Sequence, residues 1–444
     1  MIILHRYCKR YRNSFFIREV VIILEISKDV TLCDRSERKD LGLYIHIPFC
    51  VKKCDYCDFL SAPGTEQNKK DYVEALLTEI RSYEGRTGAY QVPTIFFGGG
   101  TPSCIDPEDI NRIMQEIRRV FSIRNKDPEI TIEVNPGTIT RQKLLCYQNA
   151  GINRISFGLQ STDNNELVRL GRIHSYEEFL NNYELARSLG FHNINVDLMS
   201  ALPGQTLASW EKTLRTIADL KPEHISAYSL IIEEGTAFFD RYRPGSPEEK
   251  ELPNEDLDRE IYARTKQILE EYGYHRYEIS NYAKSGYECR HNDSYWIGTD
   301  YLGLGLGASS LLNGARFCNM HDIKQYILAC NTYKNRRIMT NIEDNSVQNV
   351  ILLQDDLLRI RRDWTELTLE DQMEEFMFLG LRRCEGIRKS TFFQRFEKDI
   401  NEVYGAVLQQ LQQQKLIEIE EEWIKLTEFG IDISNTVLSV FLLN

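Results

Sequence analysis

The sequence predicts an α/β protein: a partial barrel of six strand–helix units, followed by a small helical, winged-helix-like C-terminal domain. From residue 41 onward, short apolar runs alternate with longer amphipathic segments, as in a parallel sheet with helical crossovers. Near residue 368 this pattern gives way to helices and one hairpin. We therefore expect four parts: an N-terminal extension (1–40), the barrel with its extension (41–320), an irregular connection (321–367) and the C-terminal domain (368–444).

The elements of the barrel can be assigned in order. Strands are expected at 42–47, 93–97, 130–135, 154–159, 193–199 and 224–231, and helices at 70–83, 107–121, 140–150, 176–189, 207–220 and 255–272. Asp106, Thr140 and Ser175 are expected at helix starts, and Gly190 and Gly273 at helix ends. Because the strands alternate strictly with helices, their carboxyl ends should meet at one edge of the sheet.

The C-terminal domain begins with an amphipathic helix over 368–383, whose apolar face includes Met373, Phe376 and Met377. Further helices are expected at 391–396, 401–414 and 427–435, with a hairpin of 416–420 and 423–426. Winged-helix folds often bind DNA, but this one lacks a concentrated basic helix. A docking or covering role is the better expectation.

The first forty residues differ from the rest. Residues 1–18 are basic and contain no acid, and the apolar run 20–26 is too short to span a membrane. No small-residue cleavage site follows, so a secretory signal is not expected. The segment is predicted to be a poorly ordered upstream extension, with a basic surface tether as the alternative.

Composition limits the classes of function. The formal net charge of −12 argues against nucleic acid as the main partner, because such a partner needs a basic face. The 11 Cys are scattered, which indicates a reducing compartment and not a disulfide scaffold. We expect a cytoplasmic protein, and a peripheral position at the inner face of a membrane is left open.

Cys50, Cys54 and Cys57 follow the first predicted strand with the spacing C-x3-C-x2-C. Three thiolates at this spacing can hold three irons of a cubane [4Fe–4S] cluster and leave the fourth iron open to a small chelating molecule. A disulfide would leave one Cys over, and a structural zinc site would need a fourth ligand nearby. The motif therefore predicts a [4Fe–4S] cluster.

Polar or glycine-rich residues follow the other strands at the same predicted edge. Gly98–Gly100 let a ligand approach the backbone closely, Glu133, Gln160 and Asp197 offer polar side chains at strand ends, and Arg172 can pair with a carboxylate. Each has an ordinary alternative: a turn for the glycines, a salt bridge for Glu133, a solvated surface for Arg172. Their shared position predicts a ligand site beside the cysteines.

These motifs resemble the HemN/HemW group of radical S-adenosylmethionine (SAM) proteins, from about residue 41 to beyond 311 and again in the C-terminal domain. The resemblance implies a radical SAM barrel in which SAM chelates the open iron. The SAM contacts that it implies are Tyr44, Gly99, Gly100, Thr101, Glu133, Gln160, Arg172 and Asp197. The glycine-rich run 302–310 lacks the spacing of a dinucleotide loop, and the resemblance implies that it closes over the SAM site.

Two features distinguish the branches of this group. Oxygen-independent coproporphyrinogen III oxidases have an extra Cys two residues after the third, where this chain has Phe59. The sequence from His291 to Trp296 resembles the H-N-x-x-Y-W motif of the heme-chaperone (HemW) branch. His and Tyr can bind heme iron, and Trp offers a flat apolar face. His291, Tyr295 and Trp296 are therefore the candidate heme-binding residues.

Both features favour a heme chaperone that binds heme and passes it to acceptor hemoproteins. The resemblance leaves open whether those acceptors are membrane-associated. The alternative is the oxidase, which decarboxylates coproporphyrinogen III by radical chemistry. Both functions keep the cluster and the SAM site, so the sequence leaves open whether the protein is an enzyme. It also leaves a homodimer open.

Overall fold

The computed structural model describes residues 38–124, 126–343 and 359–443, and it describes the side chains of the helix that ends at 343 only as far as 335. Nearly all of the expected N-terminal extension and part of the expected connection lie outside the described residues. In the described part of the chain, no helix is both long enough and apolar enough to cross a membrane.

One mixed sheet forms the centre of the molecule. Strands β1–β6 run parallel in chain order, as predicted, and β9 pairs in parallel with the outer side of β1. Antiparallel β10–β12 continue the sheet beyond β9, and antiparallel β8 and β7 continue it beyond β6. The strands are β1 Lys39–Ile47, β2 Tyr90–Gly99, β3 Glu129–Val134, β4 Arg154–Gln160, β5 Ile194–Ser200, β6 His224–Ser229, β7 His275–Glu278, β8 Asn281–Ala283, β9 Tyr301–Leu304, β10 Ser309–Leu312, β11 Ala315–Asn319 and β12 Arg361–Glu366.

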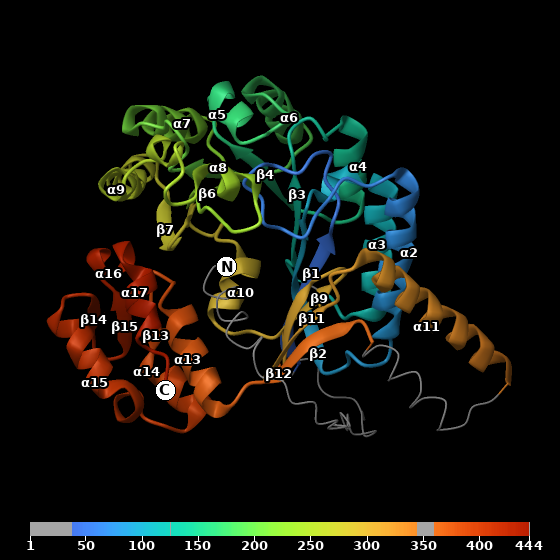
Figure 1. Ribbon diagram of the computed structural model, residues 1–444. Coiled ribbons are helices and arrows are strands. Elements are labelled where there is room, and N and C mark those ends of the chain that lie inside the picture. Colours follow the sequence, from blue (N-terminus) through green and yellow to red (C-terminus); the bar gives the residue numbers. More distant parts are fainter. Residues whose placement is uncertain (1–37, 125, 344–358, 444) are drawn as a thin grey trace.

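The long helices lie in an arc on the outside of this curved sheet (Figure 1). Asp106, Thr140 and Ser175 cap helix N-termini as predicted, and Gly190 and Gly273 follow helix ends with positive φ. The helices are α2 Glu66–Ser82, α3 Pro107–Val120, α4 Arg141–Asn149, α5 Asn164–Arg169, α6 Tyr176–Ser188, α7 Leu207–Asp219, α8 Ala237–Tyr242, α9 Glu255–Glu271, α10 Arg290–Trp296 and α11 Ile323–Glu343, with 3-10 turns at Pro102–Cys104 and Glu249–Glu251.

The alternation of side chains along β1 explains how the sheet divides the molecule. Leu43, Ile45 and Ile47 are fully buried in the core between the sheet and the outer helices. Tyr44 and His46 lie on the opposite face, toward the barrel interior, where the Tyr44 ring contacts Phe96 of β2. The outer face is thus apolar, and the inner face carries polar groups.

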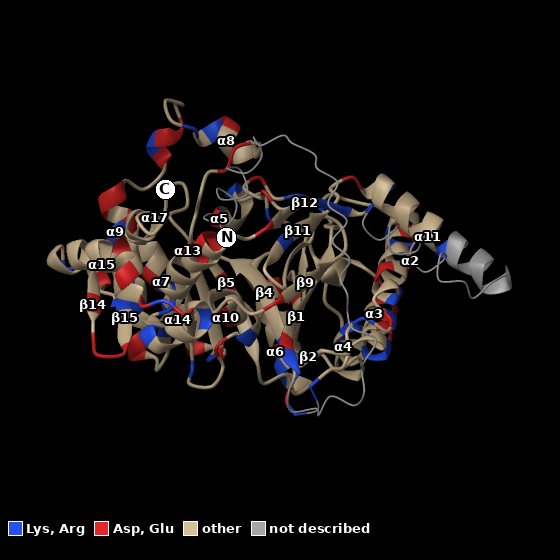
Figure 2. Ribbon diagram, turned by 90° about the horizontal axis from the view of Figure 1, so that it is seen from below, with Lys and Arg blue, Asp and Glu red and all other residues tan. Residues whose placement is uncertain are grey.

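Charged residues of both signs are interspersed along the outer helices, as the ribbon colours of α2 and α3 show in Figure 2. Arg81 of α2 pairs with Glu116 of α3 at 2.9 Å, and Arg112 of α3 pairs with Glu74 of α2. These partly exposed pairs join neighbouring helices, and each adds little stability.

The C-terminal domain lies beside α10, on the side where the sheet remains open (Figure 1). It has its own apolar core, and β14 and β15 pair as the predicted hairpin. A buried, two-pronged ion pair joins it to the sheet: Arg316 of β11 donates to Glu375 of α13 at 2.6 and 2.8 Å. Its elements are α13 Leu369–Gly380, β13 Ile387–Arg388, α14 Lys389–Phe396, α15 Ile400–Gln413, β14 Ile417–Ile419, β15 Trp423–Leu426, α16 Glu428–Asp432 and α17 Ser434–Ser439.

The structure differs from two sequence expectations. The expected irregular connection, 321–367, contains α11 and β12; α11 forms because Tyr326, Cys330 and Tyr333 recur at helical spacing and are buried. The run 302–310, expected to close over the SAM site, forms β9 beside β1, a tight turn, and the start of β10 beside β9.

Candidate cluster and cofactor site

Cys50, Cys54 and Cys57 lie in the loop that follows β1, at the carboxyl end of the parallel strands. None of the three forms a disulfide; Cys50 is buried, and the other two are half-buried. Burial raises the pKa of the Cys50 and Cys57 thiols above their ordinary value. Among the described residues, no three His, Cys, Asp or Glu side chains surround a position for one metal ion.

The glycine-rich turn after β2 is hydrogen-bonded to the backbone at the start of the cysteine loop. The N–H of Gly100 donates to Ile47 O at 2.9 Å, and the N–H of Thr101 donates to Phe49 O at 2.7 Å. A Cβ on Gly100 would lie 2.5 Å from Phe49 O, so only glycine permits this approach. The turn therefore fixes where the cysteine loop leaves the sheet.

Arg172 places a positive charge at the cysteines. Its Nη1 lies 3.5 Å from Cys54 Sγ, and its Nη2 donates to Asn135 Oδ1 at 2.5 Å and also to Gly158 O. The neighbouring loop is attached as well, because the N–H of Asp55 donates to Leu170 O at 3.2 Å. Arg172 is thus held by groups from three strand ends, and a carboxylate or a thiolate would be attracted to it.

Glu133 and Asp197 form a pair of carboxyl groups inside the barrel mouth. Glu133 receives one hydrogen bond, from the N–H of Gly99 at 3.2 Å, whereas Asp197 receives hydrogen bonds from Ser156 at 3.2 Å and Asn195 at 2.7 Å. Burial, reinforced by repulsion from Asp197, raises the pKa of Glu133 to about 8. Burial also raises the pKa of Asp197. Two such groups favour a cationic ligand.

Gln160 and Tyr44 complete the predicted set. Gln160 ends β4 with a φ of 78°, a left-handed conformation that is uncommon outside glycine, and its amide has no partner among the described residues. Tyr44 Oη is 3.1 Å from His46 Nδ1. Of the eight SAM residues implied by the resemblance, seven lie on β1–β5 or in the turn after β2, and Arg172 reaches them from the loop between α5 and α6.

Sequence reasoning missed some residues that hold this site together. Asn135 donates to Thr101 Oγ1 at 2.6 Å and accepts from Arg172, so it links two predicted contacts. Its place directly after β3 was the available signal. Tyr56 lies beside Arg172 and packs against Phe238 of α8, a contact that depends on a distant segment and has no local signal.

His291 lies at the opposite end of the barrel from the cysteines. It lies in the first turn of α10, contacts Thr94 of β2 and Glu129 at the start of β3, and is 1% exposed. Its ring stacks on Phe96 at 5.1 Å. Its Nδ1 is 2.9 Å from Thr94 Oγ1, and its Nε2 is 2.8 Å from Tyr295 Oη. Its backbone N–H donates to Glu129 at 2.9 Å, and burial lowers its pKa to about 3. Both ring nitrogens are therefore occupied, so neither can bind heme iron in this arrangement.

The other two candidate heme residues join the barrel to the C-terminal domain. Tyr295 makes an edge contact with Tyr301 of β9 at 4.6 Å. Trp296 packs against the core of the C-terminal domain, and the Arg382 guanidinium lies 4.5 Å above its ring. In this structure the motif lies at the amino-terminal end of the barrel and contacts the C-terminal domain.

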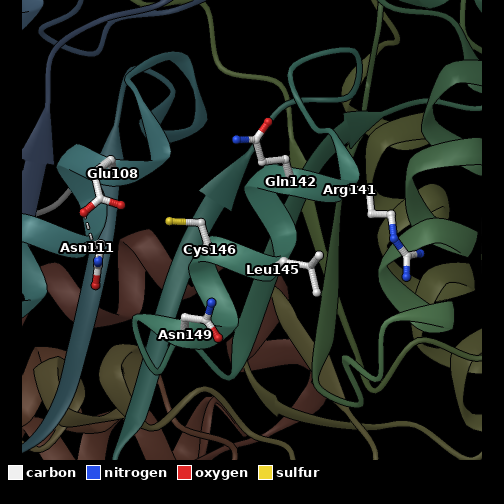
Figure 3. Close-up of a pocket in the computed structure, with 7 residues that line it drawn as sticks. All are labelled: Glu108, Asn111, Arg141, Gln142, Leu145, Cys146 and Asn149. Atoms are coloured by element: carbon white, nitrogen blue, oxygen red, sulfur yellow. Dashed lines mark hydrogen bonds between the residues drawn. The ribbon is translucent and has the colours of Figure 1, made fainter.

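A shallow hollow of 510 Å³ lies on the outer surface between α3 and α4 (Figure 3). Its lining residues are Glu108, Asn111, Arg141, Gln142, Leu145, Cys146 and Asn149. Every one of them comes from the outer helices, so the hollow is separate from the cysteine end of the barrel.

Comparisons with known proteins agree with this architecture. The Radical SAM superfamily matches residues 44–217, and the HemN C-terminal domain matches residues 367–433. The structure of coproporphyrinogen III oxidase (HemN) from Escherichia coli superposes with a TM-score of 0.73 at 24% identity, covering 92% of this chain and 91% of that one, which shows a shared fold.

Sequence relatives cover most of the chain. The heme chaperone HemW of Bacillus subtilis (strain 168) is 36% identical over 403 residues, covering 90% of this chain and 98% of that protein. The heme chaperone HemW of Haemophilus influenzae is 34% identical over 412 residues, with the same two coverages, 90% and 98%. On this evidence the chain belongs to the HemW family of radical SAM proteins.

Proposed function

We propose that this protein is a heme chaperone: it binds heme and passes it to acceptor hemoproteins, and it carries a [4Fe–4S] cluster with SAM at the open iron. The observation that carries the proposal is Phe59. Its side chain is 47% exposed on the cysteine loop, at the position where the oxidase branch has an extra Cys. The relatives named heme chaperone, which match over nearly their full length, support the same function.

Membership in the radical SAM superfamily implies the cluster and SAM, and the residues present fit both groups. The donor set offers three thiols free of disulfides. Beside them, within the described part of the chain, Glu133 has one hydrogen-bond partner and the Gln160 amide has none, as a site for a polar ligand requires. When bound, the two cofactors would supply one-electron chemistry, or they would keep the cysteine loop ordered during heme transfer.

Individual residues have distinct roles in this proposal. Cys50, Cys54 and Cys57 would hold the cluster. Glu133 and Asp197 would receive the cationic part of SAM. The remaining SAM-binding residues would be Tyr44, Gly99, Gly100, Thr101, Gln160 and Arg172, with Arg172 balancing the SAM carboxylate. We further propose a cytoplasmic location, with acceptors that include membrane-associated hemoproteins.

The test is anaerobic reconstitution of the full chain, followed by two parallel assays. The first adds hemin, records the Soret absorption, and then adds an apo-hemoprotein to follow transfer. The second supplies coproporphyrinogen III with SAM and a reductant and measures protoporphyrinogen. Heme binding and transfer without conversion support the proposal. Conversion without heme binding would replace it with the oxidase function, and loss of both activities would leave only the family assignment.

A further inference from the structure

The histidines differ sharply in their availability to a ligand. Of the seven that the structure describes, five are engaged: His46, His174, His224 and His291 are buried and hydrogen-bonded, and His275 pairs with Glu288. His192 and His321 are exposed and have no hydrogen-bond partner among the described residues. Imidazole is a common ligand of heme iron, but only with a free nitrogen.

His321 lies at the cysteine end of the sheet, against the cysteine loop. It follows β11 and flanks Gly307, the turn residue between β9 and β10. A Cβ on Gly307 would lie 2.5 Å from Leu60 Cδ2 and 2.9 Å from His321 Cδ2. Gly307 has a φ of 63°, so both its conformation and the available space require glycine. Leu60 and the imidazole of His321 therefore come together across a residue with no side chain.

This pair is held in position by buried groups. The N–H of Gly307 donates to Met320 O at 3.0 Å, directly before His321. On the other side, the Leu60 carbonyl is 2.9 Å from Nε2 of the buried His46. The preceding Asn319 donates to Glu79 at 2.7 Å inside the core. The backbone on both sides of the pair is thus fixed, while the two side chains stay accessible.

The surroundings of His321 match the chemistry of heme. Leu60, which meets the His321 ring across Gly307, is 36% exposed, and its neighbour Phe59 is 47% exposed, so the loop offers two accessible large apolar side chains. Lys53 Nζ donates to Phe59 O at 3.1 Å, which places a cation next to them for a propionate. Lys52 on the same loop is exposed as well. His192, the other exposed histidine, lies between α6 and β5, at the amino-terminal end of the strands.

We propose that His321 is an axial ligand of the heme iron, with Phe59 and Leu60 carrying the macrocycle and Lys53 facing a propionate. This inference rests on the proposed function and assigns its cargo to the rim of the barrel beside the cysteine loop. Because Cys50, Cys54 and Cys57 belong to the same loop, a cluster that orders the loop also orders the heme site.

The test is a hemin titration of the anaerobically reconstituted full chain and its variants, followed by Soret absorption and by the electron paramagnetic resonance signal of the ferric iron. His321→Ala should lose the signature of histidine ligation and bind hemin at least about tenfold more weakly. The matched control His192→Ala should behave as the wild type. In His321→Gly, added imidazole should restore the signature. Leu60→Glu should weaken binding while retaining the ligation signature at saturation.

The outcomes separate this inference from the proposed function. If the wild type binds and transfers heme but His321→Ala keeps the same spectrum and affinity, the site is wrong and the chaperone function stands. If the wild type does not bind hemin, both are wrong. If His321→Ala binds hemin normally but no longer transfers it, the surface is a docking site for the acceptor, and the ligand assignment is overturned.

Discussion

Arg172 Nη1 lies 3.5 Å from Cys54 Sγ, while its Nη2 binds Asn135 and Gly158 O. The guanidinium is thus fixed against one of the three thiols by groups from two other strand ends. A fixed positive charge at this distance favours the more negatively charged, reduced form of a cluster bound by the thiols.

Replacing Arg172 by Gln should therefore lower the midpoint potential of the reconstituted cluster, because the reduced form loses a favourable charge. It should also weaken SAM binding. A redox titration followed by electron paramagnetic resonance measures the first effect. Arg141→Gln, which changes an exposed Arg of α4, is the matched control and should leave the potential unchanged. An unaltered potential in Arg172→Gln would show that its charge is screened from the cluster.

Replacing Cys54 by Ala should abolish the cluster, because one of its three thiolates is lost. The reconstituted wild type should contain about four irons and four sulfides per chain. Cys318→Ala, in β11, should match the wild type in iron, sulfide and visible absorption. A full cubane in the Cys54 variant would contradict the assigned ligand set.

The pKa of Glu133, raised to about 8 by burial and by Asp197, makes ligand binding and stability depend on pH. The folded protein holds the Glu133 proton more tightly than the unfolded chain, where the pKa is about 4.5. The folded state is therefore favoured at low pH, and this contribution to stability is lost as pH rises from about 4.5 toward about 8. Glu133→Gln should flatten that part of the profile in thermal unfolding.

A cation beside Glu133 should ionise it, so SAM binding near neutral pH should release protons. Calorimetry in buffers of different ionisation enthalpy measures this release. The release should be smaller in Glu133→Gln than in the wild type. Equal release by both proteins would mean that another group gives up the proton.

Replacing His291 by Ala should destabilise the barrel by about 2–4 kcal/mol, because the hydrogen-bonded contacts with Thr94 and Tyr295 and the ring contact with Phe96 are all lost. Chemical unfolding measures the loss, with exposed His192→Ala as the control. The folded variant should keep the heme spectrum of the wild type. Loss of that spectrum at full folding would instead support His291 as a heme ligand.

The ion pair between Arg316 and Glu375 should behave as a buried clamp between the sheet and the C-terminal domain. Removing one partner, as in Arg316→Met, should cost about 3–5 kcal/mol, because the other charge stays buried. Replacing both residues by apolar ones, as in Arg316→Met with Glu375→Leu, should lower the free energy of unfolding by less than the sum of the two single losses. Unfolding of all four proteins in a double-mutant cycle gives the coupling, and additive losses would argue against a clamp.

The parallel strands and their helices could be predicted because their signals are local: apolar runs, helix caps and glycine stops. The residues at the carboxyl ends of β1–β5 could be predicted for the same reason, since parallel strands bring those ends together. β9 could not be predicted, because its four residues form a strand only by pairing with β1, which is far away in the chain. His291 shows the same limit: its motif is local, but which end of the barrel it occupies depends on Thr94 and Glu129.

The position of α10 has a consequence for how ligands enter and leave the barrel. His291, hydrogen-bonded to Thr94 and Tyr295, lies at the amino-terminal end, whereas the predicted SAM residues lie at the end that carries the cysteine loop. If SAM and heme bind where we propose, a large, flat cargo on Phe59 and Leu60 would lie beside the end of the barrel at which the small ligand binds. The order in which the two ligands are loaded would then affect how quickly each one leaves.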